Sequence, residues 1–239
     1  LGTDGLKPSQ RKVLYTALSK NIVSDAKVAQ FGASAAEFTD YHHGEQSLYA
    51  TIIKMCQTFV GSNNVNLFEP KGQLGTRLMG GKDAASPRYI FTHLSEYARV
   101  LFPKADDGLL RRAVSDGHVV EPETYAPIVP MGLVNGSKGL ATGWSAWIPP
   151  HALKDIVDAL LARLDNVEPT PLTPYWNGFT GRVEVEGNKV KTFGVWSRVG
   201  PDKIRITELP VGVWTQTYKE WLEQKCRRVE DHSTDVKVD

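Results

Sequence analysis

Apolar residues recur at helical spacing in four segments of the chain. In the first, which follows Pro8, they stand at i, i+1, i+4 and i+5, and proline suits the first turn of a helix. The second segment covers residues 25–38, the third begins at Leu48, and the fourth covers residues 153–164. We therefore predict four amphipathic helices, whose apolar faces are made by Val13, Leu14, Ala17 and Leu18; by Val28, Phe31 and Ala35; by Leu48, Ile52, Met55, Cys56 and Phe59; and by Leu153, Ile156, Val157, Leu160, Leu161 and Leu164.

The stretch between the third and fourth helices has a less regular pattern. Residues 93–102 carry apolar side chains in helical register, and Pro103 ends this predicted helix. Residues 106–125 are charged and rich in turn-forming residues. Residues 125–140 mix Pro, Gly and β-branched residues, which is typical of short strands and loops.

The period changes again beyond residues 168–174, a proline-rich run with the composition of a linker. Residues 182–186 and 203–209 alternate between apolar and polar side chains, as strands do, and a hairpin turn is predicted at Gly187-Asn188. Thr215 can cap a helix that runs to about Cys226. The chain as a whole is therefore predicted to have an α+β fold.

Composition limits the kind of protein more than its function. The 239 residues are 41% hydrophobic and 23% charged, which fits a globular protein of one large domain or two modest ones. No apolar run approaches the length of a membrane span, and no secretory signal stands at the first residues. Two cysteines, Cys56 and Cys226, are too few for a disulfide framework and favour a reducing compartment. The net charge of +1 means that any nucleic-acid-binding surface must be local.

The stretch from Gly80 to Thr92 has the features of a loop that presents one tyrosine. Gly80 and Gly81 allow backbone angles closed to other residues, and Pro87 biases the residue before it towards extended geometry. Arg88 and Tyr89 follow. A phenol can act as a nucleophile on a phosphodiester, and a guanidinium can hold the phosphate oxygens through paired hydrogen bonds. Taken alone, the dipeptide also fits an ordinary surface arginine beside a half-buried tyrosine.

The first three helices suggest a helix-turn-helix, with the third helix in a DNA major groove and the Gly-rich loops as the wing. His42 and His43 stand just before this third helix. They could be a satisfied pair at a helix start or part of a metal site. Adjacent histidines point in different directions, and no cysteine or acidic cluster completes a zinc set, so we predict no metal site.

Several motifs, in a fixed order, resemble those of the type IIA DNA topoisomerases of the eukaryotic branch. They are Asp4-Gly5-Leu6-Lys7-Pro8, Gly61-Ser62-Asn63-Asn64, Gly72-Gln73-Leu74-Gly75-Thr76-Arg77, Gly80-Gly81-Lys82-Asp83, Ser86-Pro87-Arg88-Tyr89-Ile90-Phe91-Thr92, and the stretches around residues 138–150 and 208–220. The sequence differs from the family pattern at Lys138, where an acidic residue is expected, and at Leu74, where phenylalanine is expected. The resemblance implies a winged-helix domain with the catalytic tyrosine at residues 1–165, followed by a tower domain at 166–239, which we expect to be incomplete.

The same resemblance implies roles for individual residues. Tyr89 is expected to form a covalent link to a DNA 5′ end, with Arg88 at the scissile phosphate and His43 donating a hydrogen bond to it. The apolar side chain of Ile148, held just ahead of two prolines, is expected to insert between base pairs and kink the duplex. The other residues expected to contact DNA are Lys7, Arg11, Lys12, His42, Gln73, Arg77 and Lys82.

The resemblance also implies cofactors and partners. Because a free tyrosine ionises only near pH 10, catalysis needs help from phosphate-binding groups and a metal that stabilises the leaving oxygen. Mg²⁺ and ATP are expected in the full-length enzyme, both bound outside this chain. Double-stranded DNA is the expected partner, in a homodimer formed through domains partly absent here, with no membrane. The expected location is the nucleus, or the cytoplasm if the protein is viral.

Three alternatives remain open from the sequence. One is a winged-helix DNA-binding module with no chemistry. Another is a structural scaffold that has lost DNA binding. The third, nearer variant is a bacterial gyrase-like protein.

Overall fold

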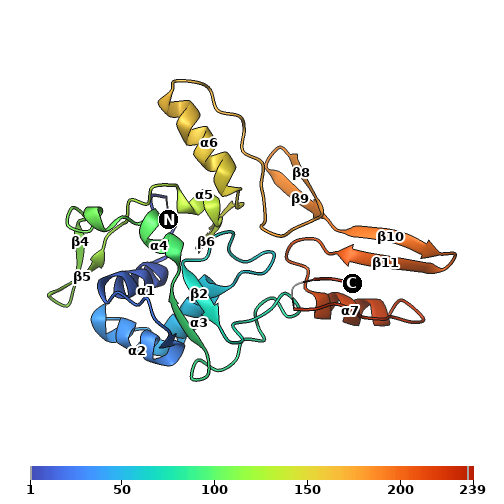
Figure 1. Cartoon of the computed structure of the whole chain (residues 1–239), viewed down its shortest axis with the longest axis horizontal. Coiled ribbons are helices and arrows are strands. Elements are labelled where there is room, and N and C mark those ends of the chain that lie inside the picture. The colour runs from blue at the N-terminus through green and yellow to red at the C-terminus, as the bar shows by residue number, and fades with distance from the viewer. Residues whose placement is uncertain (1, 236) are drawn as a thin grey trace.

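The computed structural model describes residues 2–235 and 237–239 and has an α+β fold, as predicted (Figure 1). Three helices form the first part of the chain, and a small antiparallel sheet with strand order β1-β3-β2 lies beside them. The bounds are α1 Pro8–Ser19, α2 Val28–Phe38 and α3 Glu45–Cys56 for the helices, and β1 Ala26–Lys27, β2 Phe68–Lys71 and β3 Phe91–Leu94 for the strands.

The main core lies between these helices and the sheet. Phe31 from α2 and Phe68 from β2 are almost fully buried, with their ring centroids 5.6 Å apart. Leu14 from α1 and Leu48 and Ile52 from α3 are fully buried in the same cluster. The apolar faces predicted from sequence are therefore the faces that pack, and the buried side chains hold the three helices in one rigid unit.

The middle of the chain adds short elements around this core. They are α4 Glu96–Leu101, η1 Lys104–Asp106, the hairpin of β4 Arg112–Ser115 and β5 His118–Pro122, α5 Met131–Val134, the hairpin of β6 Ser137–Ala141 and β7 Trp144–Ile148, and α6 Leu153–Leu164. Helix α6 projects from the upper side of the molecule in Figure 1. Ile156 is buried in the core cluster, whereas Leu161 and Leu164 are exposed.

The last part of the chain lies to one side of the N-terminal helices (Figure 1). It consists of two antiparallel hairpins and a helix: β8 Arg182–Glu186 with β9 Lys189–Phe193, β10 Val195–Gly200 with β11 Lys203–Glu208, and α7 Thr215–Glu223. The β8–β9 turn falls at Gly187-Asn188, as predicted. Among the described residues, no helix is both long and apolar enough to cross a membrane.

The predicted bounds of α6 and β8 agree with the structure, and several others need correction. Residues 93 and 94 are not helical, because Glu69 and Phe68 of β2 pair with them across the sheet, so helix α4 starts only at Glu96. Tertiary pairing here overrides a local helical pattern.

The remaining corrections concern shorter stretches. The charged segment 106–125 contains the β4–β5 hairpin, and the segment 125–140 contains the short helix α5. Helix α2 begins at Val28, after the short strand β1, and α3 ends at Cys56. Helix α7 begins with Thr215 as its first residue and ends at Glu223, three residues before the predicted end.

Candidate functional site

Tyr89 stands at the end of the loop formed by residues 72–90, which connects β2 to β3. Its side chain is 71% exposed, while the neighbouring Ile90 is 1% exposed and anchors the loop in the core. The Tyr89 amide donates a hydrogen bond to the Ser86 carbonyl at 2.9 Å, closing a turn around Pro87. A rigid turn on a buried anchor therefore holds the phenol out towards solvent.

The start of helix α2 fixes this turn. The amide of Val28 donates to the carbonyl of Ile90, and the amide of Ala29 donates to the carbonyl of Pro87, both at 3.0 Å. The first amides of a helix have no partner within the helix, so the loop carbonyls satisfy them. The position of the Tyr89 backbone is therefore tied to α2.

The rest of the loop is folded on itself by polar contacts that the sequence did not lead us to expect. The Gln57 side chain donates to the carbonyl of Leu74 at 2.9 Å, and the Asp83 carboxylate accepts from the amide of Thr76 at 2.8 Å and from its hydroxyl. Gly75 has φ +101°, and a Cβ there would lie 2.6 Å from the Cα of Gly81. This close approach explains why glycine is needed. A polar side chain at the end of the apolar face of α3 was the one available signal for Gln57.

The guanidinium of Arg88 lies beside the phenol that it is predicted to assist. Its central carbon is 5.9 Å from the centroid of the Tyr89 ring, and the side chain is exposed. None of the ion pairs found among the described residues involves Arg88. Arg88 and Tyr89 thus present a cation and a hydroxyl together at the surface, as an incoming phosphate requires.

His42 and His43 lie in the turn that leads into α3, and both are exposed. The His43 ring meets the ring of Tyr41 edge-on with centroids 5.5 Å apart, and His42 pairs with Asp116 at the tip of the β4–β5 hairpin at 3.1 Å. Within the described part of the chain, no hydrogen bond joins His43 to Tyr89, so the structure does not by itself bring these two side chains together.

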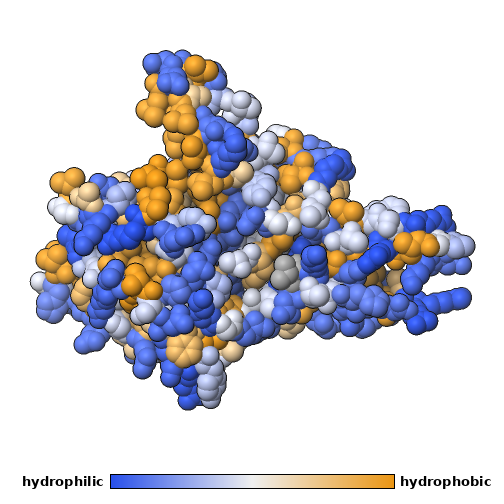
Figure 2. Space-filling view, viewed as in Figure 1, coloured by the Kyte–Doolittle hydropathy of each residue, from blue (hydrophilic) through white to orange (hydrophobic). Residues whose placement is uncertain are grey.

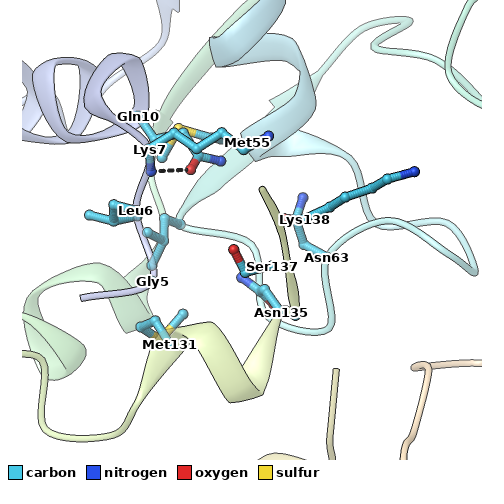
Figure 3. A pocket seen from close by; sticks show the side chains of 12 residues that line it. Gly5, Leu6, Lys7, Gln10, Met55, Asn63, Met131, Asn135, Ser137 and Lys138 are labelled. Carbon is cyan, nitrogen blue, oxygen red and sulfur yellow. Dashed lines mark hydrogen bonds between the residues drawn. The ribbon is translucent and has the colours of Figure 1, made fainter. Parts of the chain in front are cut away.

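Lys7, Gln73 and Lys82 are exposed, and Lys7 lies at the rim of a cavity of about 170 Å³ shown in Figure 3. The Lys7 amide donates to the Gln10 side chain at 2.8 Å at the first turn of α1. Residues from the start of α1, from α3 and from the α5–β6 connection line the cavity: Gly5, Leu6, Lys7, Gln10, Met55, Asn63, Leu67, Met131, Asn135, Gly136, Ser137 and Lys138.

The expectation that six cations share one exposed basic surface is wrong for Arg11, Lys12 and Arg77, because all three are paired inside the protein. The Arg11 Nε lies 2.8 Å from Asp4, and the Lys12 Nζ lies 2.9 Å from Glu121 and 2.7 Å from the carbonyl of Thr39. Arg77 is 4% exposed.

The acids on the other side of two of these pairs are buried as well. Arg77 pairs with Glu208, which is 3% exposed. Burial raises the pKa of the Asp4 carboxyl, but hydrogen bonds from Arg11 and from the amides of Tyr125 and Leu6 outweigh it, so the net pKa is lowered. These pairs therefore stabilise charges in the interior and leave little capacity for a phosphate.

Ile148 lies at the end of the β6–β7 hairpin and is 36% exposed. It pairs with Ser137 across the hairpin, directly before the proline pair at 149–150. Trp144 and Leu140 are exposed on the same hairpin, an unusual amount of apolar surface for so small an element. Lys138, opposite Trp147, is exposed, whereas Leu74 is buried, so only the second of these two departures from the family pattern is a matter of packing.

No group of three or more His, Cys, Asp or Glu side chains in residues 2–235 and 237–239 is arranged to hold a metal ion. Cys56 is buried and lies 3.2 Å from the Thr92 hydroxyl, and burial raises the pKa of its thiol to about 12. It is therefore a core residue and not a reactive one.

Comparisons with known proteins agree with this geometry. Residues 2–237 match the family model for the A-type chain of DNA gyrase/topoisomerase IV. The chain is 52% identical over 218 residues to DNA topoisomerase 2-beta of Gallus gallus, covering 91% of this chain and 13% of that protein. It is 50% identical to DNA topoisomerase 2-beta of Homo sapiens, with the same shares of each chain.

A solved structure extends the likeness to three dimensions. The Plasmodium falciparum topoisomerase II DNA-binding, cleavage and re-ligation domain superposes with a TM-score of 0.97 at 42% identity, covering 99% of this chain and 34% of that one. The chain thus spans only a small part of the curated relatives that it matches. The matches nevertheless cover nearly all of the chain, which therefore belongs to the DNA gyrase/topoisomerase IV family and is of the eukaryotic type II topoisomerase kind.

Proposed function

We propose that this chain is the DNA-binding and DNA-cleaving part of an ATP-dependent type II topoisomerase, an isomerase that passes one duplex through another. In this proposal Tyr89 is the nucleophile. The observation that carries it is the exposed phenol on a firmly anchored turn, beside an arginine that has no ion-pair partner within the described residues. Membership of the family and the likeness to a topoisomerase II cleavage domain support it.

The proposed reaction is a reversible transfer of a phosphodiester. The Tyr89 oxygen bonds to phosphorus as its proton leaves, the bond from phosphorus to the 3′ oxygen breaks, and that oxygen is protonated. The product is a 5′-phosphotyrosyl link and a free 3′ hydroxyl, which reseals the strand by attacking in reverse. Arg88 stabilises the negative charge that grows on the phosphate oxygens, and His43 donates a further hydrogen bond to them.

Charge stabilisation at the leaving oxygen is the role a metal would fill, and the described residues offer no cluster that fits one. We therefore propose that Mg²⁺ and ATP are bound by parts of the enzyme outside this chain. The chain covers 13% of DNA topoisomerase 2-beta of Gallus gallus, which leaves ample room for such parts.

Double-stranded DNA is the proposed partner of the exposed groups Lys7, His42, Gln73, Lys82 and Arg88. Ile148 on its exposed hairpin is the proposed wedge between base pairs. Arg11, Lys12 and Arg77 are proposed to hold the fold behind this surface, because their charges are already neutralised within the protein.

We further propose that residues 1–165 form the winged-helix domain and residues 166–239 part of the tower domain. The proposed assembly is a homodimer closed through other parts of the enzyme. The proposed location is the nucleus, or the cytoplasm if the protein is viral. Eukaryotic relatives such as those of Homo sapiens and Bombyx mori support the first of these locations.

The proposal is tested by trapping the covalent adduct with denaturant in the full-length enzyme. Tyr89→Phe removes only the nucleophilic oxygen, so we expect no adduct and nearly unchanged DNA binding. Arg88→Ala should also abolish cleavage, since loss of one such stabilising group costs roughly a hundredfold or more in rate. Wild-type amounts of adduct in Tyr89→Phe would refute the assignment and favour a winged-helix module that binds DNA without cutting it.

A further inference from the structure

The loop that carries Tyr89 is bound at its middle to the last part of the chain. We call residues 180–239 the C-terminal part. Figure 1 shows β11 and α7 of the C-terminal part beside the loop that leaves β2. The amide of Gln216 in α7 donates to the carbonyl of Leu78 at 3.1 Å, and the amide of Arg77 donates to the carbonyl of Asp235 at 3.4 Å. The loop is therefore fixed from a second side, far along the sequence from α2.

A buried ion pair is the centre of this attachment. Arg77 of the loop and Glu208 of β11 lie 131 residues apart in sequence and are 4% and 3% exposed. The Arg77 guanidinium also donates to the carbonyl of Leu209 at 3.2 Å. The second Glu208 oxygen accepts hydrogen bonds from the amide and the hydroxyl of Thr180, both at 3.0 Å. Each charge has several fixed partners, so the pair allows little movement of either backbone.

Trp214 completes the attachment by packing against the loop. A Cβ added to Gly80, whose φ is +61°, would lie 2.3 Å from Cε2 of the Trp214 indole, so the ring rests directly on the loop backbone. The same indole meets the Phe59 ring edge-on, with centroids 5.8 Å apart. The loop is thus held between the end of α3 and the start of α7.

A continuous set of hydrogen bonds connects this attachment to the turn of Tyr89. Thr76, next to Arg77, is bound by Asp83, and its carbonyl accepts from the Gly81 amide at 2.8 Å. The Ala85 amide donates to the Gln73 carbonyl at 2.9 Å, just before the turn that begins at Ser86. Movement at Arg77 must therefore displace the strands of the loop that carry the turn.

We propose that Arg77 and Glu208 are positioning residues for Tyr89, which transmit the placement of the C-terminal part to the nucleophile. Neither residue touches DNA in this role. The inference rests on the proposed function, because it assigns a partner for the same tyrosine. A shift of about 1 Å in a reacting group can cost on the order of a hundredfold in rate, so a small displacement at the pair suffices to disable cleavage.

The first test needs no DNA and uses the full-length protein. Glu208→Gln keeps the shape of the side chain and removes its charge. We expect amide exchange over residues 76–89 to quicken about tenfold or more at a temperature well below unfolding, because the loop opens locally. Ile156→Ala is the matched control, since Ile156 is buried in α6, which packs against α5. Unchanged exchange over residues 76–89 in Glu208→Gln would overturn the inference.

The second test separates positioning from general damage. Single-turnover adduct formation on saturating DNA should fall ten- to a hundredfold in Glu208→Gln, with the Kd for DNA changed less than about twofold. Arg77→Lys keeps the charge but loses the forked geometry, so its rate should lie between the two. Ile156→Ala should cleave at the wild-type rate. Equal losses in Ile156→Ala and Glu208→Gln, or a lost affinity with an unchanged rate, would contradict positioning.

The two proposals fail separately. If the wild-type enzyme forms no adduct at Tyr89, the proposed function is wrong, while amide exchange still decides whether Glu208 controls the loop. If the wild-type enzyme cleaves and Glu208→Gln cleaves equally well, the nucleophile stands and the positioning role is wrong.

Discussion

Two sets of cations in this protein look alike in the sequence and differ in the structure. Arg11, Lys12 and Arg77 are paired with acids in the interior. Lys7, Lys82 and Arg88 are exposed. We call them the internal and the exposed cations. The difference teaches that a basic residue inside a DNA-binding motif can serve the fold instead of the phosphate backbone.

Figure 2 makes the same point for the whole surface. Hydrophilic side chains are spread over the visible face and do not form one basic stripe, and apolar side chains gather along α6. The net charge of +1 agrees with such a surface. Binding of DNA must then depend on a few well-placed cations, which makes the distinction between the two sets testable.

The largest expected effect is on folding stability when an internal cation is removed. Arg11→Met leaves the fully buried Asp4 without its partner, and breaking such a pair costs about 3 kcal/mol. Lys7→Met, on the exposed first turn of the same helix, should change stability by about 0.5 kcal/mol or less. Chemical denaturation of both variants measures this difference. Equal stabilities would mean that Arg11 is not a structural cation.

A second large effect separates two isoleucines on neighbouring elements. Ile156→Ala should cost about 2–5 kcal/mol of stability, because the side chain is buried. Ile148→Ala should cost little, yet it should reduce the bending of a doubly labelled duplex measured by energy transfer. Normal bending together with a stability loss of several kcal/mol in Ile148→Ala would show that Ile148 is a core residue.

The exposed cations should control the salt dependence of DNA binding. Each phosphate contact contributes about −0.9 to the slope of log K against log salt, so Lys82→Met should flatten the slope by about that amount. Lys12→Met should leave the slope unchanged, because Glu121 and the Thr39 carbonyl already hold its ammonium group. A flatter slope in Lys12→Met would place that lysine on the DNA instead.

The smallest expected effect is a dependence of stability on acid. The folded pKa of Asp4 lies below its unfolded value, so the carboxylate stabilises the fold above the unfolded pKa, and this contribution is lost as pH falls through the folded one. In Asp4→Asn, the free energy of unfolding should therefore fall less steeply between neutral pH and about pH 3 than in the wild type. Parallel pH profiles would argue that Arg11 does not stabilise the Asp4 carboxylate.

The sequence was sufficient where local pattern and packing agree. Helices α1, α3 and α6 follow from their apolar faces, and Tyr89 follows from its Gly- and Pro-containing loop together with the family motifs. The inward direction of Arg11 could not be predicted, since it depends on the chain ahead of α1 folding back. Gly5, with φ +71°, makes that turn and lies so close to Gly132 that a Cβ would come within 2.2 Å of its amide nitrogen.

Contacts between distant segments were the main omission. Arg77 and Glu208 lie in two separately recognised motifs, and nothing in either motif indicates that they meet. The strand at residues 91–94 was missed for the same reason, because its partner β2 lies in another segment. Long-range pairing of this kind is set by the complete fold and not by a local window of sequence.

The central claim is that Tyr89 is the residue linked to DNA. The most direct measurement is mass spectrometry of the trapped adduct from the full-length enzyme, after protease and nuclease digestion. The account predicts that a 5′-phosphorylated nucleotide is attached to the Tyr89 side chain. Attachment to another residue, or through a 3′ phosphate, would contradict it.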